Sequence, residues 1–126
     1  MPYIYEEAEK LEGQPSVGTK QCVALVKQYA KTPSSSFWRE GAAVKGNARI
    51  RRGTAIATFS SGTYANGSSG NHAAIYLSQD ATGIMVIDQW SASGTIRLRR
   101  LPFRGQDKDG RYITPSNNGD AFSVIE

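Results

Sequence analysis

Residues 19–31 read TKQCVALVKQYAK, and this stretch predicts the best-defined helix of the chain. Its apolar side chains recur at the i, i+3, i+4, i+7 spacing of one helical face, which is occupied by Cys22, Leu25, Val26 and Tyr29. Thr19 is the expected N-cap, and Pro33, with the serine run after it, ends the helix. The stretch therefore indicates a helix that turns one apolar face toward a core.

Downstream of this helix the apolar period changes to two, which is typical of strands. Strands are expected at residues 54–59, 73–78, 84–88, 95–99 and 121–125, with loops rich in Gly, Ser and Asn between them. A short helix around residues 5–11 is expected before the longer one. Helices followed by a run of strands predict an α+β fold with an antiparallel sheet, and five strands in so short a chain would make that sheet strongly curved or barrel-like.

Length and composition exclude several classes of protein. A chain of 126 residues with 39% hydrophobic residues fits one globular domain that spans residues 1–126. Its apolar runs are far shorter than the roughly 20 residues that cross a membrane. With one cysteine and one histidine, no internal disulfide and no metal site are expected. The N-terminus lacks the pattern of a secretory signal peptide, which predicts synthesis in the cytoplasm.

Cys22 is the first candidate catalytic residue. With Thr19 as the N-cap, it lies at N3 of the helix, where the partial positive charge of unpaired N–H groups favours a thiolate. The same N–H groups are suited to binding an oxyanion. The alternative is that Cys22 is a buried structural residue, as free cysteines often are.

His72 and Asp88 are candidate partners of Cys22. His72 follows a stretch rich in Gly and Ser, opens a strand, and is the single histidine of the chain. If Ser78 pairs with Ile84 in a hairpin, His72 and Asp88 lie on the same face as diagonal neighbours, within reach of side-chain contact. Asp88 would then orient the imidazole. A slip of one residue would place Gln89 there instead.

Other residues near these positions are candidates for substrate contacts. Trp90 is expected to form a wall of the site, with a core position as the alternative. Candidate oxyanion donors are the N–H of Cys22 and the side chains of Gln14 and Gln21. Gln21 could equally be a helix residue that faces solvent. Trp90 and Gln21 are therefore carried forward as candidate substrate-binding residues.

Basic side chains form two groups along the chain, and the formal net charge is +4. The groups are Arg49, Arg51 and Arg52, and then Arg97, Arg99, Arg100 and Arg104. Arg97 and Arg99 alternate along a predicted strand, which favours a charged sheet face that is exposed to solvent. The alternative is a non-catalytic, basic module that binds a polyanion.

Four motifs, in their order along the chain, resemble those of the papain-like CHAP and NlpC-type peptidoglycan amidases. They are QCVALV at 21–26, GTAIA at 53–57, NHAAIY at 71–76 and IDQW at 87–90, within a resemblance that covers residues 14–100. The resemblance implies a papain-like α+β fold, in which N-terminal helices pack on a small antiparallel β-sheet or half-barrel. It also implies a catalytic triad of Cys22, His72 and Asp88. Many members of this group have Glu or Asn where Asp88 stands here.

The small size, the basic charge and the lack of a signal peptide are most similar to type VI secretion amidase effectors of Gram-negative bacteria. This resemblance implies a monomeric cysteine amidase or endopeptidase that cuts an amide bond in peptidoglycan stem peptides or crosslinks. It also implies delivery by the type VI apparatus into a competitor's periplasm, a cognate immunity protein, no cofactor, and no nucleic-acid or membrane partner. A Cys–His protease or acyltransferase with another substrate is the alternative within enzymes.

Overall fold

The computed structural model describes residues 2–67 and 69–126. Met1, at the start of the N-terminal segment, and Ser68, in the stretch rich in Gly and Ser before His72, lie outside the described residues. Within the described residues, no helix is both long and apolar enough to span a bilayer.

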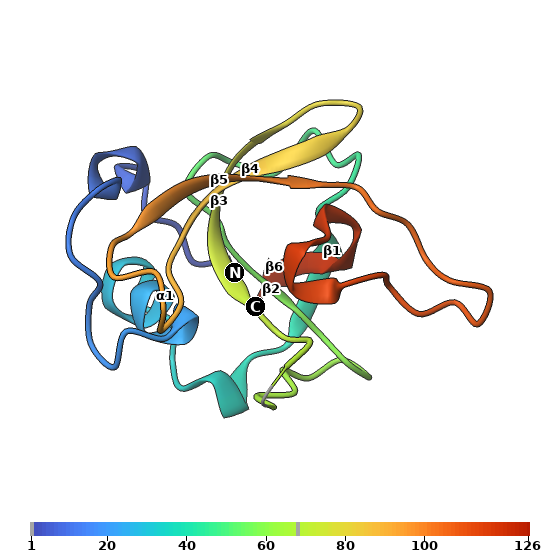
Figure 1. Cartoon of the computed structure of the whole chain (residues 1–126), viewed down its shortest axis with the longest axis horizontal. Helices are drawn as coiled ribbons and strands as arrows, with labels where there is room; N and C mark the ends of the chain where they lie inside the picture. Colours follow the sequence, from blue (N-terminus) through green and yellow to red (C-terminus); the bar gives the residue numbers. More distant parts are fainter. Residues whose placement is uncertain (1, 68) are drawn as a thin grey trace.

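A curved, six-stranded antiparallel sheet organises the chain (Figure 1). Its strands are β1 (Glu40–Ala43), β2 (Ala55–Thr58), β3 (Ala73–Gln79), β4 (Gly83–Asp88), β5 (Arg97–Pro102) and β6 (Phe122–Ile125). The spatial order is β1-β6-β2-β3-β4-β5. The helical elements are α1 (Cys22–Ala30) and four short 3₁₀ helices: η1 (Ala8–Leu11), η2 (Ser35–Phe37), η3 (Pro115–Asn117) and η4 (Gly119–Ala121).

The predicted elements are present, with shifted ends. All five expected strands form, although the one predicted at residues 95–99 begins and ends later, as β5. The helix expected around residues 5–11 is the single 3₁₀ turn of η1. Strand β1 was not expected from the sequence, because its residues, EGAA, are mostly exposed and carry no alternating apolar pattern.

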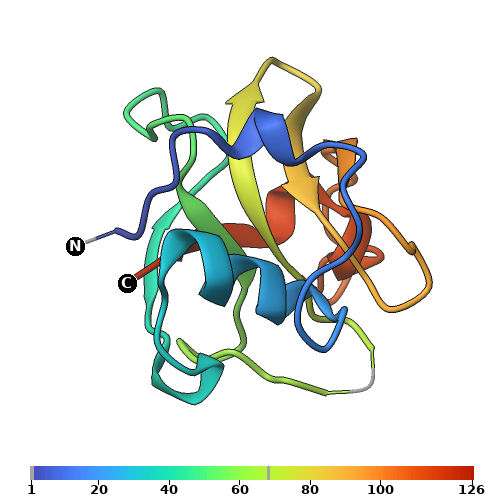
Figure 2. The same cartoon turned by 90° about the vertical axis from the view of Figure 1, so that its left-hand side faces the viewer.

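The central strands β2 and β3 are buried on both faces over most of their length, which explains their nearly continuous apolar runs. Along β3, Ala74 and Tyr76 face one cluster of core side chains, which also contains Ile56 and Phe122. The side chains that alternate with these, Ala73, Ile75 and Leu77, belong to the clusters on the opposite face, where α1 packs across the sheet (Figure 2). The helix is therefore fixed against the strand that follows His72.

The β3–β4 hairpin has the predicted register at one end only. Ile75 pairs with Ile87, as the proposed pairing requires. The predicted pair of Ser78 with Ile84 is wrong, because a bulge between Tyr76 and Ser78 shifts the register, so that Ser78 pairs with Met85. The extra residue lies at the turn end of the hairpin, and the end next to His72 keeps its register.

The start of α1 also differs from the prediction. Gln21, not Thr19, is the N-cap, so Cys22 is the first helical residue instead of the third. Residues before it form a turn, in which the Lys20 N–H donates to the Val17 carbonyl and Lys20 has a φ of 70°. This left-handed residue cannot belong to a right-handed helix, so the helix begins after it.

Candidate active site

Three predicted side chains meet where α1, β3 and β4 come together. Cys22 opens α1, His72 directly precedes β3, and Asp88 ends β4. His72 Nε2 lies 2.7 Å from Asp88 Oδ2, so the predicted contact between these residues is present. Because Nε2 is occupied by the carboxylate, Nδ1 is the ring nitrogen left for the thiol of Cys22.

Asp88 is fully buried and has charged partners. Arg99, on the neighbouring strand β5, donates from Nε to both carboxylate oxygens at 3.0 Å and from Nη2 to Oδ2 at 2.5 Å. Arg99 is held in turn by Asn117 Oδ1 at 3.1 Å and by the Trp90 ring, whose centroid lies 4.6 Å from the guanidinium carbon. The carboxylate is thus fixed from two sides, and its burial is compensated by charge.

The surroundings shift the pKa values of all three groups. Burial favours neutral forms, but hydrogen bonds from His72 and Arg99 outweigh it and lower the pKa of Asp88. Burial also disfavours the imidazolium, yet hydrogen bonds to Asp88 and Cys22 raise the pKa of His72 to about 9. Burial would raise the pKa of Cys22, but the hydrogen bond and charge of His72 lower it. The arrangement favours a thiolate–imidazolium pair.

The thiol has a second polar neighbour. The Tyr64 hydroxyl lies 3.6 Å from Cys22 Sγ, and the Asn71 amide donates to that hydroxyl oxygen at 3.2 Å. Tyr64 lies between β2 and β3, 42 residues from Cys22 in the sequence. Neither residue was a sequence candidate, because a tyrosine and an asparagine in a polar loop have no distinctive spacing.

Gln89 is not the partner of His72; it holds the segment before α1. Its buried side chain accepts from the Val17 N–H at 2.9 Å and donates to the Val17 carbonyl at 3.0 Å and the Gln21 carbonyl at 2.8 Å. Of the two alternatives left open by the sequence, only Asp88 contacts the imidazole. Gln89 fixes the peptide that leads into Cys22.

Two adjoining hollows flank His72. One, of about 270 Å³, reaches Cys22, and the other, of about 410 Å³, contains Arg99 and Asn117. Both are lined by Asn71, His72 and Trp90, so Trp90 stands at the site as predicted.

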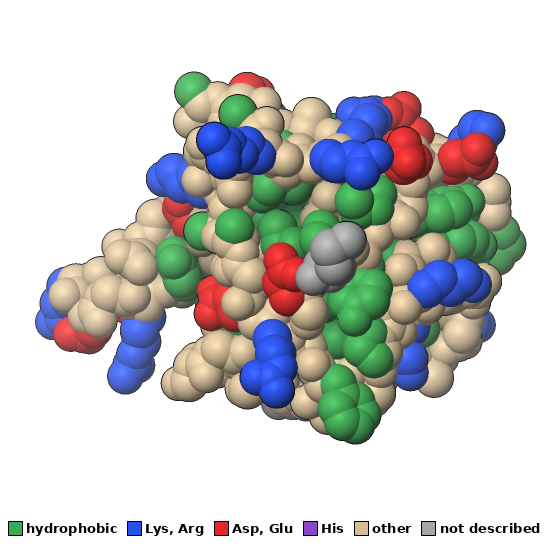
Figure 3. Space-filling view, turned by 180° about the vertical axis from the view of Figure 1, so that it is seen from behind, with side chains coloured by type: hydrophobic (Ala, Val, Ile, Leu, Met, Phe, Trp, Pro, Cys, Tyr) green, Lys and Arg blue, Asp and Glu red, His purple; other side chains and the backbone are tan. Residues whose placement is uncertain are grey.

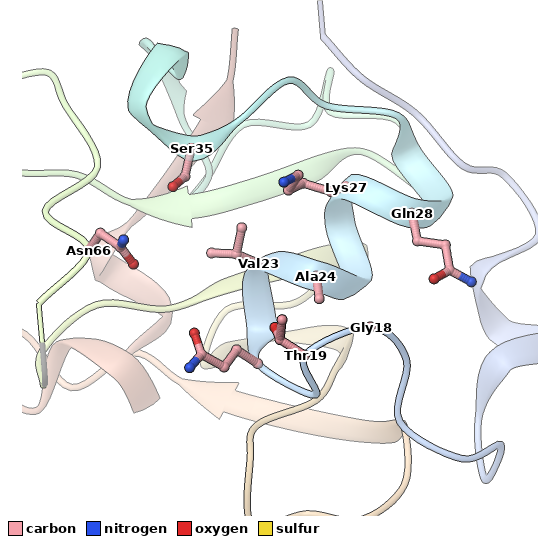
Figure 4. A pocket seen from close by; sticks show the side chains of 9 residues that line it. Gly18, Thr19, Val23, Ala24, Lys27, Gln28, Ser35 and Asn66 are labelled. Carbon is pink, nitrogen blue, oxygen red and sulfur yellow. The ribbon is translucent and has the colours of Figure 1, made fainter.

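A third hollow, of about 510 Å³, runs along the outer side of α1 and is lined by Val23, Lys27 and Asn66 (Figure 4). Gln21 lines this hollow and the one at Cys22. Gln14 does not line any of these three hollows, and its side chain donates to the Lys10 carbonyl.

The geometry suits attack by sulfur on a carbonyl carbon. The N–H of Cys22, at the first helical position, has no intrahelical acceptor and points out of the helix end. In the described part of the chain, no group of three or more His, Cys, Asp or Glu side chains is placed to hold a metal ion.

A family model, domesticated amidase effector 2, matches residues 3–125. The chain belongs to this family. A relative from Salmonella typhi named type VI secretion amidase effector 2 protein is 44% identical over 133 residues, with all of both chains covered. A relative from Ixodes scapularis named domesticated amidase effector 2 is 39% identical and covers 87% of this chain and 73% of the relative.

A solved structure of a family member, type 6 secretion amidase effector 2, has the same fold. It superimposes with a TM-score of 0.91 at 41% identity, covering 98% of this chain and 94% of that one. The predicted α+β fold of the NlpC type and the predicted resemblance to type VI amidase effectors are both confirmed.

Most residues of the two basic groups are exposed to solvent, as expected, namely Arg49, Arg51, Arg52, Arg97, Arg100 and Arg104. Arg99 binds Asp88, Arg100 binds Asp80, and Arg51 and Arg52 pair with Glu6 and Glu9. On the face shown in Figure 3, Lys and Arg side chains are scattered among acidic, hydrophobic and uncharged ones. Arg99 differs from this expectation, because its half-buried side chain binds the buried Asp88 carboxylate of β4, a contact that strand alternation alone does not reveal.

Proposed function

We propose that the chain is a cysteine amidase that hydrolyses an amide bond in peptidoglycan stem peptides or crosslinks, as a type VI secretion effector. The observation that carries the proposal is the linked set of Cys22, His72 and Asp88 at the mouth of an open hollow, in a member of a family of amidase effectors. Residues 1–126 act as one catalytic domain, because a single six-stranded sheet includes all the strands from β1 to β6.

The reaction begins with the thiolate of Cys22, which attacks the amide carbonyl carbon. The backbone N–H of Cys22 binds the resulting oxyanion. His72 donates its Nδ1 proton to the leaving amine, the C–N bond breaks, and an acyl thioester remains on Cys22. The neutral imidazole then accepts a proton from water, whose oxygen attacks the thioester, and the carboxylic acid leaves as the thiolate re-forms.

The two hollows beside His72 divide the substrate between them. The acyl carbon must lie beside Cys22 in one hollow, so we assign the amine portion of the substrate to the other hollow, which is lined by Arg99 and Asn117. The acyl portion lies beside Cys22, where Gln21 and Trp90 contact it. These assignments make Trp90 a contact for both portions.

Digestion of intact sacculi tests this proposal. Purified protein is incubated with Gram-negative sacculi, and the released muropeptides are identified by mass spectrometry. We expect release of peptides cut at one amide bond, and no release by Cys22→Ala or His72→Ala. Ser78→Ala, an exposed change at the far end of β3, is the matched control and should be as active as the unmodified chain.

Two results would contradict the proposal. Absence of released muropeptides would remove the substrate assignment and favour a protease or acyltransferase with another substrate. Full release by Cys22→Ala would remove the cysteine mechanism.

An effector of this kind also needs an immunity protein in the producing cell, and a protein that blocks the hollow at Cys22 fits that role.

A further inference from the structure

The environment of Tyr64 places a polar hydrogen next to the reacting sulfur. The side chain is 7% exposed, and its ring packs on Trp38 with a centroid separation of 4.9 Å. Its hydroxyl lies 3.6 Å from Cys22 Sγ, which is within hydrogen-bond distance for sulfur. The ring packing holds the hydroxyl against the thiol without any contribution from substrate.

Asn71 determines the direction of the Tyr64 hydroxyl hydrogen. Its Oδ1 accepts the backbone N–H of Gly67 at 2.9 Å, so the oxygen side of the amide must face Gly67. The NH₂ side therefore faces Tyr64, and Nδ2 donates to the phenolic oxygen at 3.2 Å. An oxygen that accepts from Asn71 directs its own hydrogen elsewhere, and Cys22 Sγ is the acceptor beside it.

We propose that the Tyr64 hydroxyl is a catalytic hydrogen-bond donor to the Cys22 thiolate, and that Asn71 is a positioning residue that keeps it a donor. The proposal rests on the proposed function in one respect, the role of Cys22 as nucleophile. No bond to Tyr64 forms or breaks, and the phenolic proton stays on its oxygen. His72 and Tyr64 then share the stabilisation of the sulfur anion.

The acidity of the phenol agrees with this role. Burial and the nearby negative charge of Cys22 raise the pKa of Tyr64 well above its ordinary value, so the hydroxyl keeps its proton throughout the working range. In the other direction, the hydrogen bond from Tyr64 contributes to the lowered pKa of Cys22, alongside the larger contribution of His72. A permanently protonated neighbour acts as a donor at every pH at which the thiolate exists.

Alkylation of the thiol by iodoacetamide measures this effect directly, because Cys22 is the single cysteine of the chain. In Tyr64→Phe, the acidic limb of the rate-against-pH profile should move up by about one pH unit, the size of one hydrogen bond to a charged group. A thiolate of higher pKa is intrinsically more nucleophilic, so the plateau rate at high pH should rise by about threefold. The two profiles therefore cross.

Two further variants accompany Tyr64→Phe. Asn71→Ala removes the donor that orients the hydroxyl, so the acidic limb of its alkylation profile should move in the same direction by a smaller amount. This variant replaces Tyr64→Phe as the test if Tyr64→Phe fails to fold. Tyr76→Phe is the matched control, because it removes the hydroxyl of another buried tyrosine, whose partner is Gln79. Its profile should coincide with that of the unmodified chain.

An unchanged acidic limb in folded Tyr64→Phe would overturn the proposal. A lower plateau rate without a shift of the limb would also overturn it, since that result indicates a damaged site and not a lost donor. Iodoacetamide needs no peptidoglycan, so these outcomes are separate from failure of the proposed function, which digestion of sacculi reports.

Discussion

Two aspartate–arginine pairs join β5 to the β3–β4 hairpin, and they differ chiefly in burial. Asp88 and Arg99 pair beside His72, with the carboxylate fully buried. Asp80 and Arg100 pair at the turn, with side chains 60% and 41% exposed. Arg99 and Arg100 are adjacent in the sequence, so they extend from opposite faces of the strand. The same two residue types thus give a buried ion pair beside the imidazole at one end and an exposed ion pair at the other.

The largest difference between the pairs should appear on removing one carboxylate charge from each. Asp88→Asn leaves the imidazole without its anion, and we expect kcat/KM for a peptidoglycan fragment to fall by about a hundredfold or more. Asp80→Asn should leave kcat/KM unchanged. Steady-state assays at neutral pH make the comparison. Equal losses in the two variants would show that Asp88 has no special role.

The same variants should differ in pH dependence. In the proposed mechanism His72 must hold a proton to release the amine, and its pKa is raised to about 9, so activity should decline as the pH rises through about 9. In Asp88→Asn, burial acts without the opposing carboxylate and favours the neutral ring, so this basic limb should move to lower pH. The limb of Asp80→Asn should stay in place. A limb that does not move in Asp88→Asn would contradict this account of the His72 pKa.

Removing each of the two arginines should have different effects on the free energy of unfolding. Arg99→Met leaves the buried Asp88 carboxylate with His72 as its main partner, and we expect the free energy of unfolding to fall by about 2–3 kcal/mol, with about a tenfold loss of kcat/KM. Arg100→Met removes a pair that solvent screens, so the change should be small. Urea unfolding monitored by tryptophan fluorescence measures both. A larger loss for Arg100→Met would reverse the expected order.

The smallest expected effect concerns the aromatic ring that covers Arg99. Trp90→Leu removes the cation–π contact, which is worth about 0.5–1 kcal/mol at a partly exposed position. We expect a loss of kcat/KM of a few fold, and a smaller further loss when the change is added to Arg99→Met, since only the substrate contact of Trp90 then remains to be removed. A double-mutant cycle in kcat/KM tests this. Fully additive losses would show that the contact between Trp90 and Arg99 does not contribute to activity.

Local patterns predicted much of this site. The face of α1 and the alternation of β3 and β4 follow from residue spacing, and together they bring His72 next to Asp88. The N-cap was mispredicted, because Thr19 has the right chemistry but the left-handed Lys20 intervenes. A hydrogen bond from Gln89, 68 residues from Gln21 along the chain, sets the true start of the helix.

The contacts that were missed are all distant in the sequence. Arg97 is the direct register partner of Asp88, and Arg99 reaches the carboxylate diagonally across the β4–β5 pair, so no motif marks which arginine of this basic strand binds it. Tyr64 reaches Cys22 from a loop, whose path depends on the packing of its ring against Trp38. Sequence spacing specifies which residues share one element, whereas these contacts depend on how several elements meet.

The bulge in β3 has a practical consequence for protein engineering. By absorbing one residue between Tyr76 and Ser78, it isolates the tip of the hairpin from the end that carries His72. A peptide epitope or a fluorescent label inserted at residues 80–82 would displace Asp80 and Arg100 from each other and leave the distant pairing of Ile75 with Ile87 intact. This tip is therefore a suitable attachment point for following the enzyme on cell walls while it remains active.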